Sequence, residues 1–531
     1  MSFPLLTATA ALPAVGAVVT AAVPAKQRTA AKWLALLFSV ATLVLAAIVA
    51  VRFDPDGGRY QLTESHAWIA DFGVRYELGV DGIGVALVAL TALLIPFVIL
   101  AGWHDADPQE EGVESRSVAA GRWRPTQGFF ALILLVEAMV IISFEATDVF
   151  VFYIFFEAML IPMYFLIGGF GDRAGPHGEK EAATQRSYAA VKFLLYNLVG
   201  GLIMLAAVIG LYVVAGNFSL QEIAEARANG SLDMATDTER WLFLGFFFAF
   251  AVKAPLWPLH TWLPNAMGEA TAPVAVLITA VVDKVGTFAM LRFCLQLFPE
   301  ASKWATPVIL VLALISIVYG ALLAVGQRDI KRLVAYASIS HFGFIILGIF
   351  AMTSQGQSGA TLYMVNHGIS TAALMLVAGF LISRRGSRLI ADYGGVQKVA
   401  PVLAGTFLIG GLATLSLPGL APFVSEFLVL VGTFSRYPVI GIIATIGIVL
   451  AALYTLVLYQ RTMTGPVKPS TEGIADLRVR ELAVVVPLIA VLIFLGVYPK
   501  PLTELVNPAV KHTLSDVQKK DPKPEVEAAH K

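Results

Sequence analysis

Residues 253–264 read Lys253-Ala-Pro-Leu-Trp-Pro-Leu-His-Thr-Trp-Leu-Pro264, so three prolines interrupt an apolar segment that begins with a lysine. Each proline removes a backbone N–H and frees the carbonyl group four residues earlier. Inside a bilayer, such freed groups are tolerated only where they face protein or a water-filled cavity. A second stretch, Leu417-Pro-Gly-Leu-Ala-Pro-Phe-Val-Ser-Glu426, combines prolines with a glutamate in the same way. The two stretches predict broken membrane helices with four helix-breaking residues, Pro255, Pro258, Pro418 and Pro422.

The composition of the 531-residue chain places these stretches in a membrane protein. Apolar residues make up 57% of the chain and charged residues 14%, with 37 basic and 37 acidic residues giving a net charge of zero. A soluble domain carries about 25% charged residues, and the mean hydropathy of +0.76 leaves too little polar surface for one. The composition excludes a disordered chain and a nucleic-acid binder with a basic surface. The single cysteine, Cys294, excludes an internal disulfide and a multi-cysteine metal site.

Fourteen apolar runs are long enough to cross a bilayer core of about 30 Å, which takes about 20 helical residues. They are too long and too uniformly apolar for barrel strands. The first run lacks the positive flank of a signal peptide, so we expect it to be retained. The sequence predicts an all-α polytopic membrane protein with about fourteen transmembrane helices at 3–24, 31–52, 81–102, 127–146, 148–170, 188–215, 241–258, 272–298, 305–326, 331–352, 359–383, 403–431, 436–461 and 479–498.

The loops between these runs predict the orientation of the chain. Loops after odd-numbered helices hold twenty Lys and Arg, whereas loops after even-numbered helices hold seven. Because cytoplasmic loops carry the excess of basic residues, we expect the odd-numbered loops to be cytoplasmic and both termini to face outward. Residues 66–80 alternate in polarity and predict a hairpin on the outer face. Residues 499–531, which mix lysines, acidic residues and prolines, predict a solvated tail.

Seven ionisable residues lie inside the predicted helices at a similar depth. Counted at about 1.5 Å per residue from the helix starts, most of them lie about 12–18 Å deep. A charge at mid-bilayer is costly and therefore indicates function. The seven residues are Glu137, Glu157, Lys253, Lys284, His341, His367 and Glu426. They predict a row of proton-carrying groups along the membrane plane, although structural ion pairs and polar packing between helices remain an alternative.

Each member of the row has an expected role. Glu157 and Lys253 form a switchable pair, because moving a carboxylate changes how tightly a buried lysine holds its proton. Lys284 is the central carrier and Glu426 the terminal group. The relays are His341 and His367, since histidine accepts at one ring nitrogen and donates from the other, and Glu137 is a further candidate. We expect Asp283 to pair elsewhere and Arg292 to extend to the interface.

The positions of the two breaks predict internal symmetry. The breaks lie five predicted helices apart, and this odd offset reverses the direction of the chain. We therefore expect two inverted five-helix repeats, helices 4–8 over residues 127–298 and helices 9–13 over 305–461. Residues 1–102 precede them and 479–498 follow, before the tail at 499–531. The sequence contains no phosphate-binding glycine motif, nucleophile elbow or metal-ligand cluster, so we expect no cofactor or metal site in this chain.

Several motifs resemble those of the antiporter-like subunits of respiratory complex I, the NADH-quinone oxidoreductase. These motifs lie at 253–264, at 269–273 (Glu-Ala-Thr-Ala-Pro), at 327–341 (Gln-Arg-Asp-Ile-Lys-Arg-Leu-Val-Ala-Tyr-Ala-Ser-Ile-Ser-His) and at 155–164 (Phe-Phe-Glu-Ala-Met-Leu-Ile-Pro-Met-Tyr). The resemblance covers about residues 77–500. Glu426 favours one type of subunit within the family, because subunits L and N carry lysine in that helix. Ser425 departs from the family, which commonly has glycine before this glutamate.

The resemblance implies a proton channel driven by quinone reduction in other subunits, with the roles given above for Glu157, Lys253, Lys284, His341, His367 and Glu426. It also implies FMN, iron–sulfur clusters and quinone in those other subunits, subunits L and N as neighbours, and the bacterial cytoplasmic membrane as the location. Three alternatives stay open. They are the D-type component of a multisubunit Mrp-type Na⁺/H⁺ antiporter, the equivalent subunit of a membrane-bound hydrogenase, and a scaffold whose buried charges serve assembly.

Overall fold

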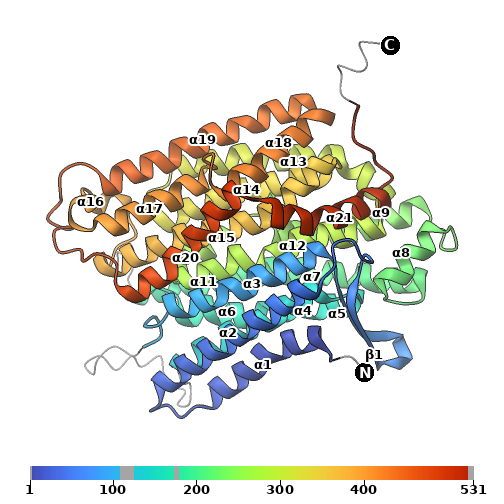
Figure 1. The fold of residues 1–531 in the computed structure, drawn as a ribbon, viewed down its shortest axis with the longest axis horizontal. Coiled ribbons are helices and arrows are strands. Elements are labelled where there is room, and N and C mark those ends of the chain that lie inside the picture. The colour runs from blue at the N-terminus through green and yellow to red at the C-terminus, as the bar shows by residue number, and fades with distance from the viewer. Residues whose placement is uncertain (1–2, 108–124, 173–178, 524–531) are drawn as a thin grey trace.

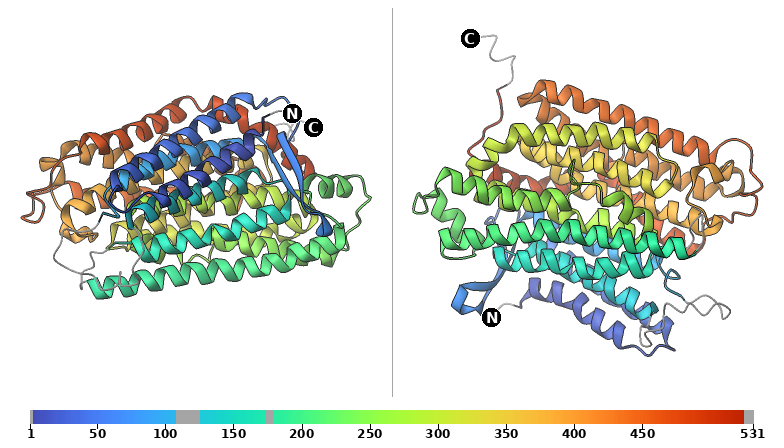
Figure 2. Two further views of the ribbon diagram at one scale, coloured as in Figure 1. Left: turned by 90° about the horizontal axis from the view of Figure 1, so that it is seen from below. Right: turned by 180° about the vertical axis from the view of Figure 1, so that it is seen from behind.

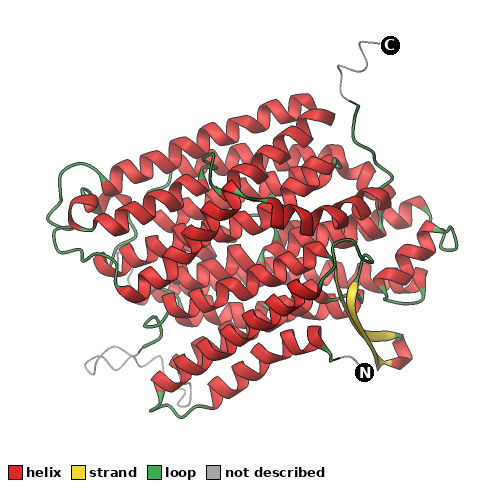
Figure 3. Ribbon diagram, in the orientation of Figure 1, coloured by secondary structure: helices red, strands yellow, loops and turns green. Residues whose placement is uncertain are grey.

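The computed structural model describes residues 3–107, 125–172 and 179–523. Within these ranges the chain forms a bundle of helices that run along one common direction, with a single small hairpin at one end (Figures 1 and 3). Twelve of the described helices are long and apolar enough to cross a membrane. The prediction of an all-α polytopic membrane protein is confirmed in this respect.

The N-terminal part contains three long helices and the hairpin. Strands β1 and β2 pair in antiparallel fashion, from Gln61 opposite Val80 to Ile69 opposite Val74. The predicted hairpin is confirmed, although its first strand begins before residue 66. The elements are α1 (Leu5–Ala22), α2 (Arg28–Arg52), β1 (Gln61–Ile69), β2 (Val74–Val80) and α3 (Gly82–Ala101).

The first predicted repeat contains an interrupted helix and a central, fully buried one. The predicted helix 241–258 ends at Lys253, because Pro255 and Pro258 lie in the irregular segment that follows. The segment 272–295 alternates between α-helical and π-helical turns. The elements are α4 (Pro125–Glu145), α5 (Val149–Ala158), α6 (Leu160–Phe170), α7 (Glu179–Ala215), α8 (Leu220–Ala228), α9 (Thr236–Lys253), α10 (Leu263–Glu269), α11 (Ala272–Val276), the π-helical turn Leu277–Val282, α12 (Lys284–Ala289) and the π-helical turn Met290–Leu295.

The second predicted repeat contains the other interrupted helix. The run 403–431 divides into α17 and α18, with Pro418 between them and Pro422 in the first turn of α18. The elements are α13 (Pro299–Val325), α14 (Ile330–Ala351), α15 (Ser354–Arg385), α16 (Val396–Val399), α17 (Pro401–Thr414), α18 (Ala421–Arg436) and α19 (Pro438–Met463), followed by α20 (Val479–Val497) and α21 (Lys500–Asp516).

Helix α21 corrects the prediction of a solvated tail over 499–531. Val506, Ala509 and Val510 on one face of this helix are buried, and the helix packs along α3 and α15. Its last residue, Asp516, forms a 2.7 Å ion pair with Arg59, which precedes the hairpin. The mixed charges of this segment occupy the outer face of an amphipathic helix, which is why composition alone indicates a solvated tail.

The bundle has two distinct ends (Figures 1 and 2). We call the end that carries the hairpin, the start of α1 and α8 the hairpin end. We call the other the basic end; it carries the α1–α2, α13–α14 and α19–α20 connections. Helices α14, α15 and the segment 272–295 are buried almost throughout, whereas α2, α7, α19 and α20 expose apolar side chains. Lys284, His341 and His367 lie on these buried central elements.

Candidate functional site

The interruption of α9 holds Lys253 at the end of a helix inside the bundle. The Lys253 ammonium donates a hydrogen bond to the Phe156 carbonyl at 2.6 Å and lies 3.6 Å from the centre of the Phe156 ring. The indole N–H of Trp262, beyond the break, donates to the Val252 carbonyl at 3.0 Å. A backbone group near the break is thus satisfied by the chain itself, and the lysine is aimed at α5.

Glu157 lies next to Phe156, at the turn between α5 and α6. Its carboxylate interacts electrostatically with Lys253, but the lysine donates its hydrogen bond to the neighbouring carbonyl. Gly201 of α7 provides the space for this carboxylate, because a Cβ at that position would lie 2.1 Å from the carboxyl carbon. The structure therefore brings the predicted pair together in one region without direct contact.

A contact between Lys284 and His367 lies at the centre of the site. The lysine Nζ is 2.7 Å from the histidine Nδ1 and 4.1 Å from the centre of the Phe342 ring. Lys284 begins α12 and is separated by one residue, Asp283, from the π-helical turn Leu277–Val282. Such turns are frequent at functional sites. When Lys284 is charged, its ammonium can only donate, so His367 then accepts at Nδ1 and carries its own hydrogen on Nε2. Two of the predicted residues therefore form one hydrogen-bonded unit.

The row continues from His367 through aromatic side chains to Glu426. The centres of the His341 and His367 rings are 5.1 Å apart. The Tyr454 hydroxyl lies 3.4 Å from His341 Nε2, and the Tyr363 hydroxyl donates to Glu426 at 3.4 Å. All of these residues are buried. The two tyrosines are missing from the sequence-predicted set, and a phenol hydroxyl in an otherwise apolar helix is the signal that identifies them.

The break before α18 orients Glu426 toward α15. The Asn366 amide of α15 donates to the Ala421 carbonyl at 2.9 Å, which anchors the first turn of α18. The Ser425 hydroxyl donates to the Pro422 carbonyl at 2.9 Å. The Ser425 hydroxyl thus bonds within its own turn, and the neighbouring Glu426 accepts from Tyr363 of α15.

Three other buried charged residues lie outside this row. Glu137 is fully buried, neither of its carboxyl oxygens has a hydrogen-bond partner, and the row described above does not include it. Arg292, which we expected to extend to the interface, is buried and forms a 2.8 Å ion pair with Asp81, the residue before α3 at the hairpin end. Asp283 interacts electrostatically with both Lys253 and Lys284, and its carboxyl oxygens have no hydrogen-bond partner.

A cavity of about 400 Å³ opens at the basic end, between the ends of α3, α14, α15 and α20. Lys331 at its wall pairs with Asp172 and donates to the Ala270 carbonyl at 2.7 Å. The charged residues that line the cavity are Asp105, Asp172, Lys331, Arg384, Arg478, Arg480 and Glu481. Across the described ranges, no group of three or more His, Cys, Asp or Glu side chains could hold a metal ion.

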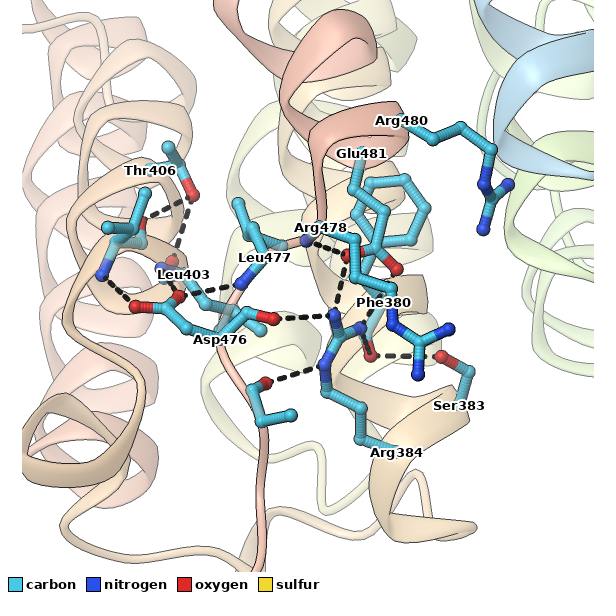
Figure 4. A network of polar contacts seen from close by, with 12 residues as sticks. Phe380, Ser383, Arg384, Leu403, Thr406, Asp476, Leu477, Arg478, Arg480 and Glu481 are labelled. Carbon is cyan, nitrogen blue, oxygen red and sulfur yellow. Dashed lines mark hydrogen bonds and ion pairs between the residues drawn. The ribbon is translucent and has the colours of Figure 1, made fainter.

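One wall of this cavity is a polar network on the α19–α20 connection (Figure 4). Arg384 of α15 forms two hydrogen bonds with the Glu481 carboxylate, at 3.1 and 2.5 Å, and donates to the Asp476 carbonyl at 3.0 Å. The Asp476 carboxylate accepts from the Leu403 N–H at 2.8 Å, in the first turn of α17. The network fixes the connection to two helices, and it leaves Arg480 pointing away from it toward α3.

Asp105, in the turn after α3, lies in the same cavity. Burial and the neighbouring Asp172 carboxylate raise the pKa of Asp105 from 3.8 to about 7, against the opposing effect of Arg480 and Lys331. Between these two pKa values the unfolded chain is ionised while the folded chain holds the proton. The carboxyl group therefore destabilises the fold by an amount that is absent below about pH 4, grows with pH, and is constant above about pH 7.

We therefore expect Asp105→Asn to raise the thermal unfolding temperature of the detergent-solubilised protein at pH 8, with a smaller increase at pH 5. The amide mimics the protonated carboxyl and removes the cost of keeping the group neutral or of ionising it in the cavity. Asp237→Asn, on the exposed first turn of α9, is the matched control and should show no such pH dependence. An equal gain at both pH values would contradict the prediction.

Comparisons with known proteins agree with the motifs. A family model described as "NADH:quinone oxidoreductase/Mrp antiporter, TM" matches residues 146–451. A protein of Mycobacterium tuberculosis named NADH-quinone oxidoreductase subunit M is 56% identical over 97% of this chain and 95% of its own length. The subunit M of Rhodobacter capsulatus is 38% identical over 93% and 92%. NADH-ubiquinone oxidoreductase chain 4 of Marchantia polymorpha is 32% identical over 94% and 95%.

Two solved structures share the fold. A chain in the structure of respiratory complex I from Thermus thermophilus superposes with a TM-score of 0.83, at 30% identity over 96% of this chain and 99% of that one. A chain of the Mrp complex from Dietzia superposes with a TM-score of 0.81, at 21% identity over 98% of this chain and 100% of that one. The second likeness shows the fold alone, because its sequence identity is low.

Proposed function

Since the chain belongs to the NADH:quinone oxidoreductase/Mrp antiporter family, we propose that it is a proton-translocating subunit in the membrane arm of a respiratory NADH:quinone oxidoreductase. Its nearly full-length similarity to proteins named subunit M supports this assignment over other members of the family. Quinone reduction takes place in other subunits, and this chain moves protons without a redox site of its own.

One observation carries the proposal: the 2.7 Å contact between Lys284 and His367 within a row that ends at Glu426. Lys284 gives a proton to the Nδ1 of His367 and can be reloaded from the α9 side, while His367 releases its other hydrogen toward His341. Tyr363, whose ring centre is 5.8 Å from that of His341, then connects this histidine to the terminal carboxylate at Glu426, and the Tyr454 hydroxyl lies 3.4 Å from His341 Nε2. Each of these groups can both accept and donate a proton, so the row passes protons without any group leaving its helix.

The Glu157–Lys253 pair is the switch of this row. In the structure, the Lys253 ammonium rests on the Phe156 carbonyl, beside the carboxylate and not on it. When the carboxylate approaches, it favours the charged form of the lysine; when it withdraws, the lysine releases its proton toward Lys284. Pro255 and Pro258 allow the end of α9 to shift during this change, as Pro418 and Pro422 do for α18.

Two inverted five-helix repeats carry the two halves of the site. Asp148 caps the start of α5 and pairs in a short β-bridge with Ser219, which follows α7. Asp329 caps the start of α14 and pairs in the same way with Leu389, which follows α15. This repetition supports the symmetry. Added to the twelve long apolar helices, the interrupted helices α9–α10 and α17–α18 give the fourteen membrane crossings expected from the sequence.

The basic end faces the cytoplasm of a bacterial cell, and the hairpin end faces outward. The excess of Lys and Arg in the loops of the basic end supports this orientation. FMN, iron–sulfur clusters and quinone belong to other subunits of the complex, and the antiporter-like subunits L and N are the neighbours of this chain in the membrane arm. The exposed apolar side chains of α2, α7 and α19 face the lipid.

Isolation of the chain with its native partners tests the proposal. We expect it to co-purify with flavin-containing and iron–sulfur subunits and with NADH-dependent quinone reduction. The D-type component of an Mrp-type Na⁺/H⁺ antiporter is the second candidate, because the Mrp complex chain has the same fold. Recovery in a small assembly that lacks redox proteins would favour that candidate and overturn the first.

A further inference from the structure

Asp283 is a buried carboxylate that interacts with two lysines of the row but has no role described so far. The side chain is fully buried and neither carboxyl oxygen has a hydrogen-bond partner. An ionised carboxylate in such a place is costly unless cations lie nearby. The charged groups that act on it are Lys284, next in sequence, and Lys253, across the interface with α9. Lys253 in turn interacts with two carboxylates, Glu157 and Asp283.

The backbone geometry places this carboxyl group against the break in α9. Gly286 packs directly on the last turn of α9, since a Cβ there would lie 2.9 Å from both the Phe250 carbonyl oxygen and the Ala254 nitrogen. Residues three apart on a helix share one face, so Asp283 and Gly286 both face the end of α9. Lys253 lies at that end. The Asp283 side chain therefore lies on the helix face that packs against the end of α9, where its carboxylate interacts electrostatically with Lys253.

The π-helical turn before Asp283 separates it from Lys284. The Asp283 N–H donates to the Ile278 carbonyl, five residues earlier, at 2.9 Å. Successive residues on a helix point in different directions, and here one side chain faces α9 while the next reaches His367 on α15. The two adjacent residues therefore face the two halves of the proton row.

We propose that Asp283 is a proton relay between Lys253 and Lys284. The inference rests on the proposed function and adds a residue to it. In the first step an N–H bond of the Lys253 ammonium breaks and an O–H bond forms on the Asp283 carboxylate. In the second step that O–H bond breaks and an N–H bond forms on neutral Lys284. No electron is transferred, and the carboxylate is restored after each proton.

Without Asp283, no group among the described residues of the row links Lys253 to Lys284. The hydrogen bonds of Lys253 and Lys284 lead away from each other, to Phe156 and His367. The unpartnered oxygens of Asp283 leave both of its lone-pair regions free to accept from either side. Rotation of the side chain, or a water held by these oxygens, completes each contact.

The test uses the intact complex reconstituted into vesicles, with quinone reduction and proton translocation measured together. We expect Asp283→Asn to lower translocation per quinone reduced by at least about tenfold, in keeping with the loss of a proton-transfer group. We expect Asp283→Glu to retain most of the activity, because it keeps a titratable carboxyl group. Glu145→Gln is the matched control, since Glu145 is also fully buried and unpartnered, at the end of α4.

A static counter-charge would also be lost in Asp283→Asn, so a second measurement is needed. We expect infrared difference spectra of the working complex to contain a carboxyl band that shifts in D₂O and disappears in Asp283→Asn. Absence of this band in the parent complex would overturn the relay. The Lys284→Met variant separates the two proposals. Normal translocation in both Lys284→Met and Asp283→Asn contradicts the proposed function. Normal translocation in Asp283→Asn, together with a loss in Lys284→Met, contradicts only the relay. If Asp283→Asn does not assemble, the Asp283→Glu variant and the parent spectrum decide.

Discussion

Replacing Lys284 by methionine is expected to abolish most proton translocation while the fold persists. Methionine has a similar volume and fits an apolar core, but it has no proton to give to His367, which Lys284 contacts at 2.7 Å. We expect translocation per quinone reduced to fall by at least about tenfold. The measurement is acidification of vesicles that contain the intact complex, with NADH-dependent quinone reduction recorded in the same sample.

The matched control is Lys303→Met, in the first turn of α13 at the hairpin end, where the lysine pairs with Glu300 alone among the described residues. This variant should pump like the parent. The amount of assembled complex is compared across variants, so that a loss of assembly is not read as a loss of translocation. Parent-like translocation in assembled Lys284→Met would contradict the central role of this lysine.

The largest expected effect on stability comes from Gly432 of α18, where that helix meets α15. A Cβ at this position would lie 2.2 Å from the Gly356 nitrogen and 2.7 Å from its Cα. These are backbone atoms that cannot rotate away, so α18 has to move as a whole. Overpacking of a core costs about 1–3 kcal/mol in ordinary cases. We expect Gly432→Leu to lower the free energy of unfolding by about 3 kcal/mol or more. We also expect the displaced α18 to move Glu426 away from Tyr363.

Gly405→Leu in α17 is the matched control, because a Cβ at Gly405 has no atom within 4 Å. The thermal unfolding temperature and the yield of assembled complex should fall for Gly432→Leu and stay near the parent values for Gly405→Leu. Equal stability of the two variants would show that α15 and α18 separate without cost, which the close backbone contact argues against.

Hydropathy and proline spacing predicted the fold class, the hairpin and the position of both helix breaks. The reason is physical: a bilayer requires long apolar helices, and a proline cannot continue the hydrogen-bond pattern of one. The resemblance to complex I antiporter-like subunits is confirmed by the family match over residues 146–451. The role of 500–516 was not predictable in this way, because an amphipathic helix and a solvated tail share the same composition.

Counting along the predicted helices places Lys284, His341, His367 and Glu426 at one depth in the membrane. The count does not predict which of these side chains contact one another. Lys284, which contacts His367, lies shortly after a π-helical turn that changes the directions of the side chains beyond it, and sequence periodicity carries no signal for such a turn. The sequence predicts that Asp283 pairs elsewhere than with Lys284, because adjacent residues on a helix point in different directions. Helical periodicity alone does not predict that Asp283 faces the break in α9, because that depends on how the two helices pack.

The ion pair between Arg59 and Asp516 joins residues 457 positions apart in the sequence. Arg59 is synthesised long before Asp516, and almost all of the helices of the chain are synthesised in the interval. Throughout synthesis the region around the hairpin therefore lacks its partner, and the backbone of Gly82 lacks the Leu505 carbonyl packed against it. The contacts that tie α21 to the hairpin region can form only after α21 has been synthesised, so this part of the bundle is completed last.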